Sequence, residues 1–396
     1  MFEQAKQQFI EGIAHFEAER YAQAEQCFEA SLKLLPGRAS TLANLAATRL
    51  RLGRPEAALP LLDEVLAGNA DDADAAGHRA AVLCALGRDA EALPDMQRVL
   101  AARPDRASAW VSQGQALQRL DRLDEALLSF DRALALEAEL PAVWSQRGSI
   151  LKEMGRRDEA VASFRGALAR GGDVQLNHYF LSALDAGEMP DSAPRAYVEA
   201  LFDHYAPSFD EHLVGALGYR AHLVLIEHLQ ALGERRYRSA LDLGCGTGLC
   251  APLVKPFADR LVGVDLSQAM LGRAQALGLY DKLRHADADA HLQSTPERHD
   301  LLIAADVFIY VGRLEAMFGG VRRVLEPGGI FCFSVERADE ADDVVLTHGL
   351  RYAQSERYLR ALAAQHGFEW LKLLRQPIRE DQRRAIDGLF VYLRRA

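Results

Sequence analysis

The chain has 396 residues, of which 49% are hydrophobic and 26% charged, a balance typical of a globular protein in water. This length exceeds one ordinary core and predicts two domains, and no apolar run is long enough to span a bilayer. The formal net charge of −10 argues against a large phosphate-binding surface, and therefore against a nucleic-acid partner.

The first residues and the cysteines both point to the cytoplasm. The start, Met-Phe-Glu-Gln-Ala-Lys, lacks a basic region followed by an apolar core, so we expect no secretory signal. The cysteines are scattered and include no Cys-x-x-Cys pair, which predicts reduced thiols and no metal site. They are Cys27, Cys84, Cys245, Cys250 and Cys332.

Residues 1–172 carry a pattern that recurs every 34 residues. Each copy has an arginine (Arg20, Arg54, Arg88, Arg122, Arg156), an alanine (Ala24, Ala58, Ala92, Ala126, Ala160), a bulky apolar residue (Phe28, Leu62, Met96, Phe130, Phe164) and a small residue (Gly12, Ala46, Ala80, Gly114, Gly148). Trp110, Trp144, Pro36 and Pro104 stand at two further fixed positions. The pattern resembles the tetratricopeptide repeat, which implies five pairs of antiparallel helices stacked as an all-α solenoid.

Arrays of this kind bind extended peptide segments in a groove lined by the first helix of each repeat. We therefore expect a protein or peptide partner, although the same side chains also suit a plain solvated surface. The lysine and asparagine set with which some relatives clamp a C-terminal carboxylate is incomplete. The expected groove residues are Asn44, Arg51, Ser112, Gln115, Gln118, Arg119, Gln146 and Lys152.

Residues 173–196 are expected to join the repeats to a second domain. The amphipathic stretch 174–184 is predicted to cap the last repeat, and Pro190 and Pro194 mark a linker. Residues 197–213 then resemble the Phe-Asp-x-Tyr-Ala-x-x-Phe-Asp lead-in of many small-molecule methyltransferases. In those relatives the segment folds over the cofactor as a lid, which would put Tyr205 and Phe209 near a sulfonium that aromatic faces attract. The alternative is a plain amphipathic helix that docks on the sheet.

Residues 240–248, Ala-Leu-Asp-Leu-Gly-Cys-Gly-Thr-Gly, predict a short buried strand followed by a glycine-rich turn. Gly244, Gly246 and Gly248 would let the backbone turn tightly and pass close to a ligand. A second strand ends at Asp265, 21 residues past Gly244, about where such a sheet places an acid against ribose hydroxyls. The run is G-x-G-x-G and not the G-x-G-x-x-G of dinucleotide binders. Together these features indicate a nucleoside-bearing cofactor.

The loop and the residues after it resemble class I S-adenosylmethionine-dependent methyltransferases, and the whole chain resembles bacterial proteins that join tetratricopeptide repeats to such a domain. The resemblance implies an α/β Rossmann-like domain over residues 197–396, with a seven-stranded, mostly parallel sheet and S-adenosylmethionine as cofactor. It implies that Asp287 accepts from the adenine amine while Ala288 offers its backbone N–H, although Asp289 can take the first role instead. The implied cofactor residues are Asp242, Gly244, Cys245, Gly246, Gly248, Asp265, Leu266, Met270, Asp287, Ala288, Tyr205 and Phe209.

The apolar run from Asp300 to Asp306 predicts a buried parallel strand whose carboxyl end places Asp306 at the reaction centre. A helix is expected over 314–325, a strand over 330–335 and an antiparallel last strand over 389–393. A hydroxyl or amine acceptor must lose a proton, and the candidate bases are Asp306, Tyr205, His204, His212, Glu336 and His348. We select Asp306 on position, and Tyr205 in the lid, as candidate catalytic residues.

Two absent motifs narrow the substrate class. Asp306-Val-Phe-Ile stands where enzymes that methylate exocyclic amines carry Asn/Asp-Pro-Pro-Tyr/Phe, and no Pro-Cys nucleophile is present. The sequence therefore favours a methyltransferase for a small molecule or a protein- or carrier-bound acceptor, with repeats that recruit a protein partner. The alternative is an interaction scaffold whose second domain binds the cofactor without catalysing transfer.

Overall fold

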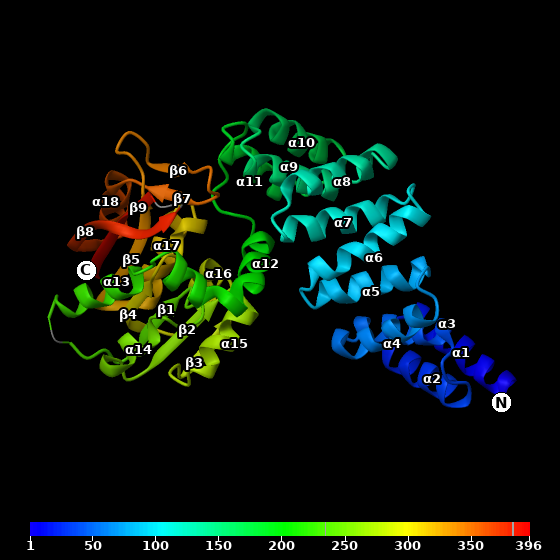
Figure 1. Cartoon of the computed structure of the whole chain (residues 1–396). Helices are drawn as coiled ribbons and strands as arrows, with labels where there is room; N and C mark the ends of the chain where they lie inside the picture. The colour runs from blue at the N-terminus through cyan, green and yellow to red at the C-terminus, as the bar shows by residue number, and fades with distance from the viewer. Residues whose placement is uncertain (234, 382–383) are drawn as a thin grey trace. The chain divides into compact units, whose positions relative to one another are not determined.

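The computed structural model describes residues 1–233, 235–381 and 384–396. They form two compact units, Met1–Asp173 and Val174–Ala396 (Figure 1). The division falls one residue from the expected end of the repeats. No helix among the described residues is both long and apolar enough to cross a membrane.

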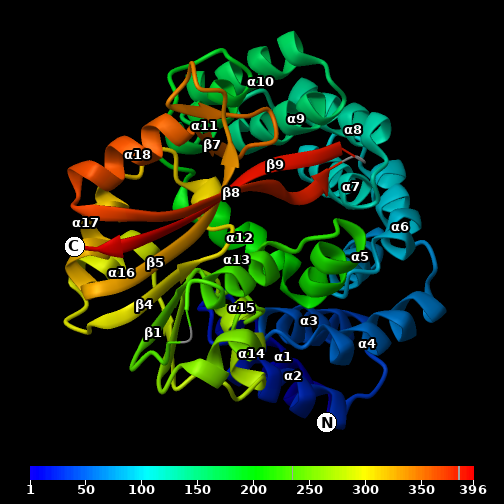
Figure 2. The same cartoon turned by 90° about the vertical axis from the view of Figure 1, so that its left-hand side faces the viewer.

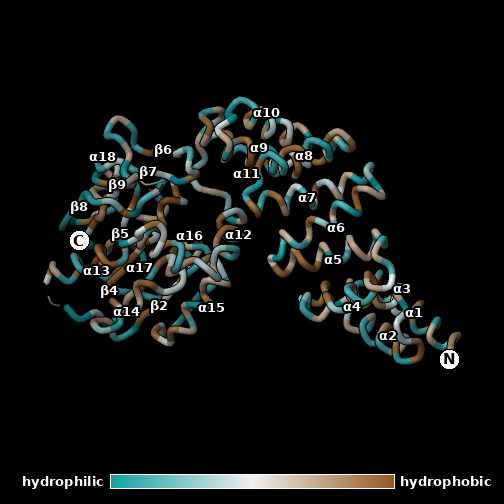
Figure 3. Tube along the Cα trace, viewed as in Figure 1, coloured by the Kyte–Doolittle hydropathy of each residue, from teal (hydrophilic) through white to brown (hydrophobic). Residues whose placement is uncertain are grey.

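The first unit is the predicted stack of helix pairs. Teal and brown alternate along these helices in Figure 3, as expected where one helical face is buried and the other is exposed. The bounds are α1 Phe2–Glu17, α2 Tyr21–Leu34, α3 Ala39–Arg51, α4 Pro55–Gly68, α5 Ala73–Ala85, α6 Asp89–Ala102, α7 Ala107–Arg119, α8 Leu123–Leu136, α9 Pro141–Glu153 and α10 Arg157–Ala169.

Within each repeat the small residue and the bulky residue face one another. A β-carbon on Gly148 would lie 2.6 Å from the Phe164 ring, and Gly12 and Gly114 stand in the same relation to Phe28 and Phe130. Where the sequence has alanine at this position, the matching bulky residue is not aromatic (Ala46 with Leu62, Ala80 with Met96). The helices of a pair can therefore approach closely because the volumes of the two positions are matched.

The second unit is built on a twisted sheet, whose longer strands run across the view in Figure 2. Its strands are β1 Ala240–Leu243, β2 Leu261–Asp265, β3 Lys282–His285, β4 His299–Ala304, β5 Leu325–Arg337, β6 Val344–Leu346, β7 Tyr352–Gln354, β8 Phe368–Asp381 and β9 Arg384–Arg395. The first five run parallel in the order β3-β2-β1-β4-β5. β9 pairs antiparallel with β5 and carries β8, which confirms the predicted antiparallel last strand. Among the described residues, β6 and β7 bring the sheet to nine strands, two more than expected.

Alternate residues of the central strands supply two separate cores. On one face Leu241, Val264 and Phe333 pack against α16 (Ala288–Ser294), α17 (Glu315–Val324) and α18 (Glu356–Gln365). On the other face Ala240 and Ile303 pack against α13 (Ala221–Gln230) and α14 (Ala251–Val254). Because both faces are buried, these strands have continuous apolar sequences. The carboxyl ends of the strands are where ligands bind in open sheets of this kind.

The segment that we expected to cap the repeats is packed into the second unit. Helix α11 (Val174–Ala183) buries Tyr179, whose hydroxyl donates to the Leu350 carbonyl at 2.5 Å. Farther along, the backbone N–H of Ala193 donates to the Tyr310 carbonyl at 3.0 Å. Residues 174–195 are therefore an ordered part of the second unit rather than a loose linker. A capping role for α11 stays a prediction.

Candidate active site

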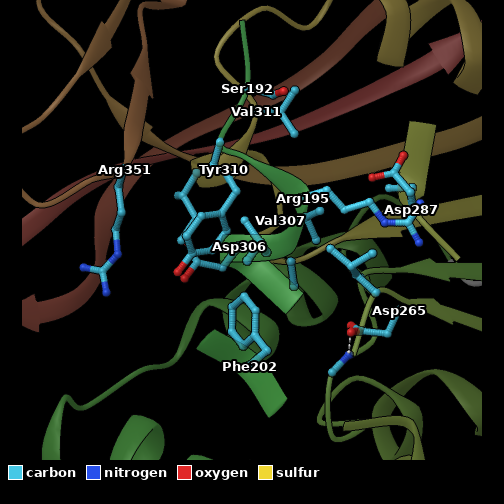
Figure 4. Close-up of a pocket in the computed structure, with 18 of the residues that line it drawn as sticks. Ser192, Arg195, Phe202, Asp265, Asp287, Asp306, Val307, Tyr310, Val311 and Arg351 are labelled. Carbon is cyan, nitrogen blue, oxygen red and sulfur yellow. Dashed lines mark hydrogen bonds between the residues drawn. The ribbon is translucent and has the colours of Figure 1, made fainter. Parts of the chain in front are cut away.

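A cavity of about 670 Å³ lies at the carboxyl ends of β1, β2 and β4. Its walls combine the glycine-rich loop, α12 (Arg195–Tyr205), and residues 190–194 of the segment before α12. This volume lies within the range of roughly 300–1,000 Å³ that is typical of small-molecule sites. Figure 4 shows side chains from these separate parts of the chain meeting around one space.

The glycine-rich loop has the backbone geometry that its sequence predicts. Gly244 has a φ of +66°, and a β-carbon there would lie 2.5 Å from the Val307 side chain. Gly246 has a φ of +53° and nothing within 4 Å of its missing β-carbon. Both conformations favour glycine, and the open space beside Gly246 lets a ligand approach the backbone.

Asp265 is fixed at the end of β2 by two backbone donors. The N–H of Gly246 donates to Oδ2 and the N–H of Ser267 donates to Oδ1, each at 2.8 Å. Burial raises the pKa of Asp265, and these backbone hydrogen bonds oppose the rise. The carboxylate lines the cavity with lone pairs left over, as an acceptor of ribose hydroxyls requires.

Asp242 is a second buried carboxyl group at the loop. Burial raises its pKa to about 7, with a further contribution from the nearby charge of Asp265. The Tyr280 hydroxyl donates to Asp242 Oδ2 at 2.6 Å and opposes that rise. Asp242 therefore changes charge near neutral pH, within the cavity wall.

A buried ion-pair network forms another part of the wall. Asp306 follows β4 with a φ of +59°, a strained backbone for a residue other than glycine. Its two carboxylate oxygens accept hydrogen bonds from Arg379, at 3.1 and 3.4 Å. Arg379 also donates to Glu336, and its side chain is 1% exposed. Asp306 thus lines the cavity as the sequence predicted, but it is held by an arginine that the sequence analysis missed.

The lid segment contributes two aromatic rings to the cavity, and only one of them was predicted. Phe209 lines it, and the ring of Phe202 lies 5.9 Å from that of Phe209 and also lines it. Tyr205 does not line it: the residue is 41% exposed and its ring lies 6.1 Å from that of His212. Tyr205 is the last residue of α12, and a short 3-10 helix, Ala206–Ser208, follows it directly. The structure therefore does not support the expected position of Tyr205 over a sulfonium.

Two other expected cofactor residues serve packing instead. Gly248 has a φ of +96°, and a β-carbon there would lie 2.7 Å from Leu277, so its small size accommodates the end of α15 (Gln268–Ala276). Met270 is fully buried within α15. Neither lines the cavity, whereas the other expected residues do: Asp242, Gly244, Cys245, Gly246, Asp265, Leu266, Asp287, Ala288 and Phe209.

The sequence left open which acid accepts from the adenine and which residue is the base, and the candidates differ in whether they line the cavity. Asp287 lines the cavity, whereas Asp289 does not. Of the six candidate bases, all among the residues that the structure describes, only Asp306 lines the cavity. His204 and His212 are exposed, and the Nδ1–H of His348 donates to the Ala183 carbonyl at 2.7 Å.

An unpredicted pair, Tyr219 and His222, stands beside the glycine-rich loop. The two rings are stacked with centroids 5.4 Å apart, and both residues line the cavity. Nδ1 of His222 is buried without a hydrogen-bond partner among the described residues. Burial lowers the pKa of His222 and raises that of Tyr219, so both stay neutral near pH 7. The only sequence signal was a tyrosine and a histidine three residues apart at the start of a helix.

These residues fit S-adenosylmethionine. Gly246 leaves open space beside the backbone, and Asp265 presents a fixed carboxylate. Asp287 and Ala288, to which the resemblance assigns the adenine, line the same cavity. The buried, unpartnered Nδ1 of His222 is a further polar atom in a cavity-lining residue. No group of three or more His, Cys, Asp or Glu residues suited to a metal ion occurs in the described parts of the chain.

A second hollow, of about 480 Å³, lies in the repeats between α5, α6 and α7. Three of the expected groove residues, Ser112, Gln115 and Arg119, line it. Arg119 also donates to Asp89 at 2.6 and 2.9 Å, so its charge is already matched. The other five groove residues lie outside this hollow.

Comparison with known proteins agrees with both units. A methyltransferase domain model matches residues 241–333, and tetratricopeptide repeat models match residues 15–82, 86–141 and 141–170. The malonyl-[acyl-carrier protein] O-methyltransferase of Pseudescherichia vulneris is 30% identical over 182 residues, which are 44% of this chain and 69% of that protein. The sterol 24-C-methyltransferase ERG6B of Gibberella zeae is 31% identical over 133 residues, 32% of this chain and 33% of that protein.

Among solved structures, the N-methyltransferase NodS from Bradyrhizobium japonicum, in complex with S-adenosyl-L-homocysteine, is similar with a TM-score of 0.41. It is 19% identical and the match covers 50% of this chain and 97% of NodS. The chain spans only 33–59% of the length of the first four curated relatives it matches.

The fold and the cavity define a methyltransferase domain of the Rossmann-like class. The chain belongs to the S-adenosylmethionine-dependent methyltransferases and carries tetratricopeptide repeats before the methyltransferase domain. Its cofactor is S-adenosylmethionine.

Proposed function

We propose that the protein transfers the methyl group of S-adenosylmethionine to a small molecule or to an acceptor carried on a protein, and that its repeats recruit that partner. The observation that carries the proposal is the single cavity in which Gly246 and Asp265 share a space with Asp306, Tyr310 and residues beyond them. Such a cavity has walls for a cofactor and further walls for a second molecule. A relative that acts on malonyl-[acyl-carrier protein] lends support to a carrier-bound acceptor.

The bound cofactor supplies a methyl group on a positively charged sulfur. The protein's task is then to align the acceptor with that group and to exclude water, which accounts for most of the catalysis in an in-line displacement. Phe202, Phe209 and Tyr310 suit both tasks, because the Phe202 ring contacts both of the other rings at centroid distances of 5.9 and 5.4 Å. All three residues line the cavity, and Figure 4 shows the rings of Phe202 and Tyr310 next to each other.

Asp306 remains our candidate for accepting a proton from a hydroxyl or amine acceptor. Its hydrogen bonds to Arg379 fix the carboxylate in place, and each oxygen retains a lone pair. If Asp306 is the base, Asp306→Asn should lower turnover by roughly 100-fold or more while S-adenosylhomocysteine still binds. A smaller loss would assign Asp306 a positioning role.

Two measurements test the function itself. Isothermal titration should show S-adenosylmethionine and S-adenosylhomocysteine binding in the micromolar range, with no binding of NAD. Radiolabelled methyl transfer into fractionated cell extract should then label an acceptor fraction. Cofactor binding with no labelled acceptor in any fraction would favour the alternative, a scaffold whose methyltransferase-like domain does not catalyse transfer.

A further inference from the structure

The lid contains two Phe-Asp pairs seven residues apart. In each pair the phenylalanine and the aspartate make different contacts. The phenylalanines, Phe202 and Phe209, line the cavity. The aspartates, Asp203 and Asp210, point instead to the rim of the cofactor site, where each accepts a hydrogen bond from a buried hydroxyl group. The lid segment therefore combines ring contacts with the cavity and hydrogen bonds from its aspartates.

The two aspartates bind on either side of Asp265. The Ser267 hydroxyl donates to Asp203 and the Thr247 hydroxyl donates to Asp210, each at 2.5 Å. Ser267 and Thr247 are 0% and 4% exposed, so these contacts are shielded from water on the side of the hydroxyl groups. Arg273 adds to the second contact, because it donates to the Pro207 carbonyl at 2.9 Å and lies 3.4 Å from Asp210.

Both hydroxyl groups belong to residues at or next to the backbone N–H groups that fix Asp265, the predicted ribose acceptor. Ser267 is itself one of the two residues whose N–H groups hold the Asp265 carboxylate, and Thr247 directly follows the other, Gly246. A movement of the lid that breaks these contacts would therefore release the loop beside Asp265. The lid is thus joined to the glycine-rich loop through Thr247 and to the turn after β2 through Ser267.

We propose that Asp203 and Asp210 are positioning residues that hold the lid on the glycine-rich loop and on the turn after β2, so that cofactor affinity depends on them through Ser267 and Thr247. This inference rests on the cofactor assignment made above. Hydrogen bonds between a hydroxyl and a carboxylate are among the stronger ones in proteins, since one partner carries a full charge. Breaking one of them should weaken S-adenosylhomocysteine binding by about tenfold or more.

A double-mutant cycle on the full chain tests the second contact. Thr247→Val and Asp210→Ala should each weaken S-adenosylhomocysteine binding by about tenfold or more in isothermal titration, and the double variant should bind no worse than either single variant. Thr247→Ser, which keeps the hydroxyl group, should restore the affinity of the unaltered protein. Independent, additive losses, or single variants that bind like the unaltered protein, would overturn the proposal.

Protease sensitivity gives a readout that does not depend on turnover. Chymotrypsin cleavage within residues 202–209 should be slowed by S-adenosylhomocysteine in the unaltered protein, and less so in Asp210→Ala and Asp203→Ala. Glu211→Ala is the matched control, because this neighbouring acid is exposed, and it should behave like the unaltered protein. Equal protection in all four proteins would contradict the proposal. Circular dichroism checks that each variant is folded, and failure of the unaltered protein to bind would refute the cofactor assignment instead.

Discussion

The ring of Phe164 fills the space that a β-carbon on Gly148 would need, with ring atoms 2.6–2.9 Å from that position. Alanine is the better helix former by about 1 kcal/mol, so glycine is retained here for its size. We predict that Gly148→Ala destabilises the repeats, because overpacking of this kind costs about 1–3 kcal/mol. In a Phe164→Leu background, which copies the Ala46 and Leu62 pair, the same change should become stabilising.

The measurement is urea unfolding followed by the helical circular dichroism signal. Gly68→Ala serves as the control, because nothing lies within 4 Å of its missing β-carbon. The sign reversal is the decisive result, and a Gly148→Ala change that has the same effect in both backgrounds would contradict the volume matching.

Asp265→Ala should weaken cofactor binding. The carboxylate is a charged acceptor for two ribose hydroxyls, and such bonds contribute roughly 1.5–3 kcal/mol, or on the order of 10- to 100-fold in affinity. Titration with S-adenosylhomocysteine measures the effect. An unchanged dissociation constant in a folded variant would mean that the ribose lies elsewhere.

The two candidate adenine acceptors are separated by a pair of substitutions. Asp287 lines the cavity and also caps α16, since its side chain accepts from the Ala290 N–H at 3.0 Å. Asp287→Ser keeps a capping oxygen but removes the charge, so it should weaken S-adenosylhomocysteine binding without unfolding the helix. Asp289→Ala should bind normally, and a reversed order of the two variants would assign the adenine to Asp289.

The pKa of Asp242 predicts a pH-dependent stability. Burial raises this pKa to about 7, far above its ordinary value of 3.8, so the folded state favours the protonated form. The contribution of Asp242 to stability is therefore full below the unfolded pKa and is lost as the pH rises through about 7. Asp242→Asn cannot ionise and should stabilise the second unit more at pH 8 than at pH 5.5, by on the order of 1 kcal/mol or more. Thermal unfolding at both pH values measures this difference, and an equal effect at both would show that Asp242 is already ionised in the folded protein.

Removal of Arg379 should be strongly destabilising. Its loss would leave Asp306 and Glu336 as unpaired acids in a buried position, which typically costs about 3–5 kcal/mol. Arg379→Met should therefore lower the melting temperature of the second unit by roughly 6 °C or more. Arg375→Met is the matched control in the same strand: Arg375 is 59% exposed and pairs with Glu356, so its loss should cost less than about 1 kcal/mol.

Local sequence patterns predicted the parts of this protein that are built from neighbouring residues. The 34-residue period revealed the repeats, and strand, loop and acid followed one another closely enough to identify the loop beside Asp265. The contribution of Arg379 to the cavity was not predicted, because this residue lies 73 residues after its partner Asp306 in the sequence. Tyr205 differs for another reason: the motif marks the segment but not the residue at which its helix ends, and Tyr205, the last residue of α12, is 41% exposed.

The position of Tyr179 determines where a chimaera of this protein can be joined. It belongs to the first helix after the repeats, yet its side chain is buried among the aromatic rings of the second unit, near Tyr197 and Tyr352. A chimaera that joins other repeats to this methyltransferase domain should therefore be spliced between Asp173 and Val174. A splice placed just before the lid would discard Tyr179 together with the residues at 190–195 that line the cavity, and would exchange part of the cavity wall along with the repeats.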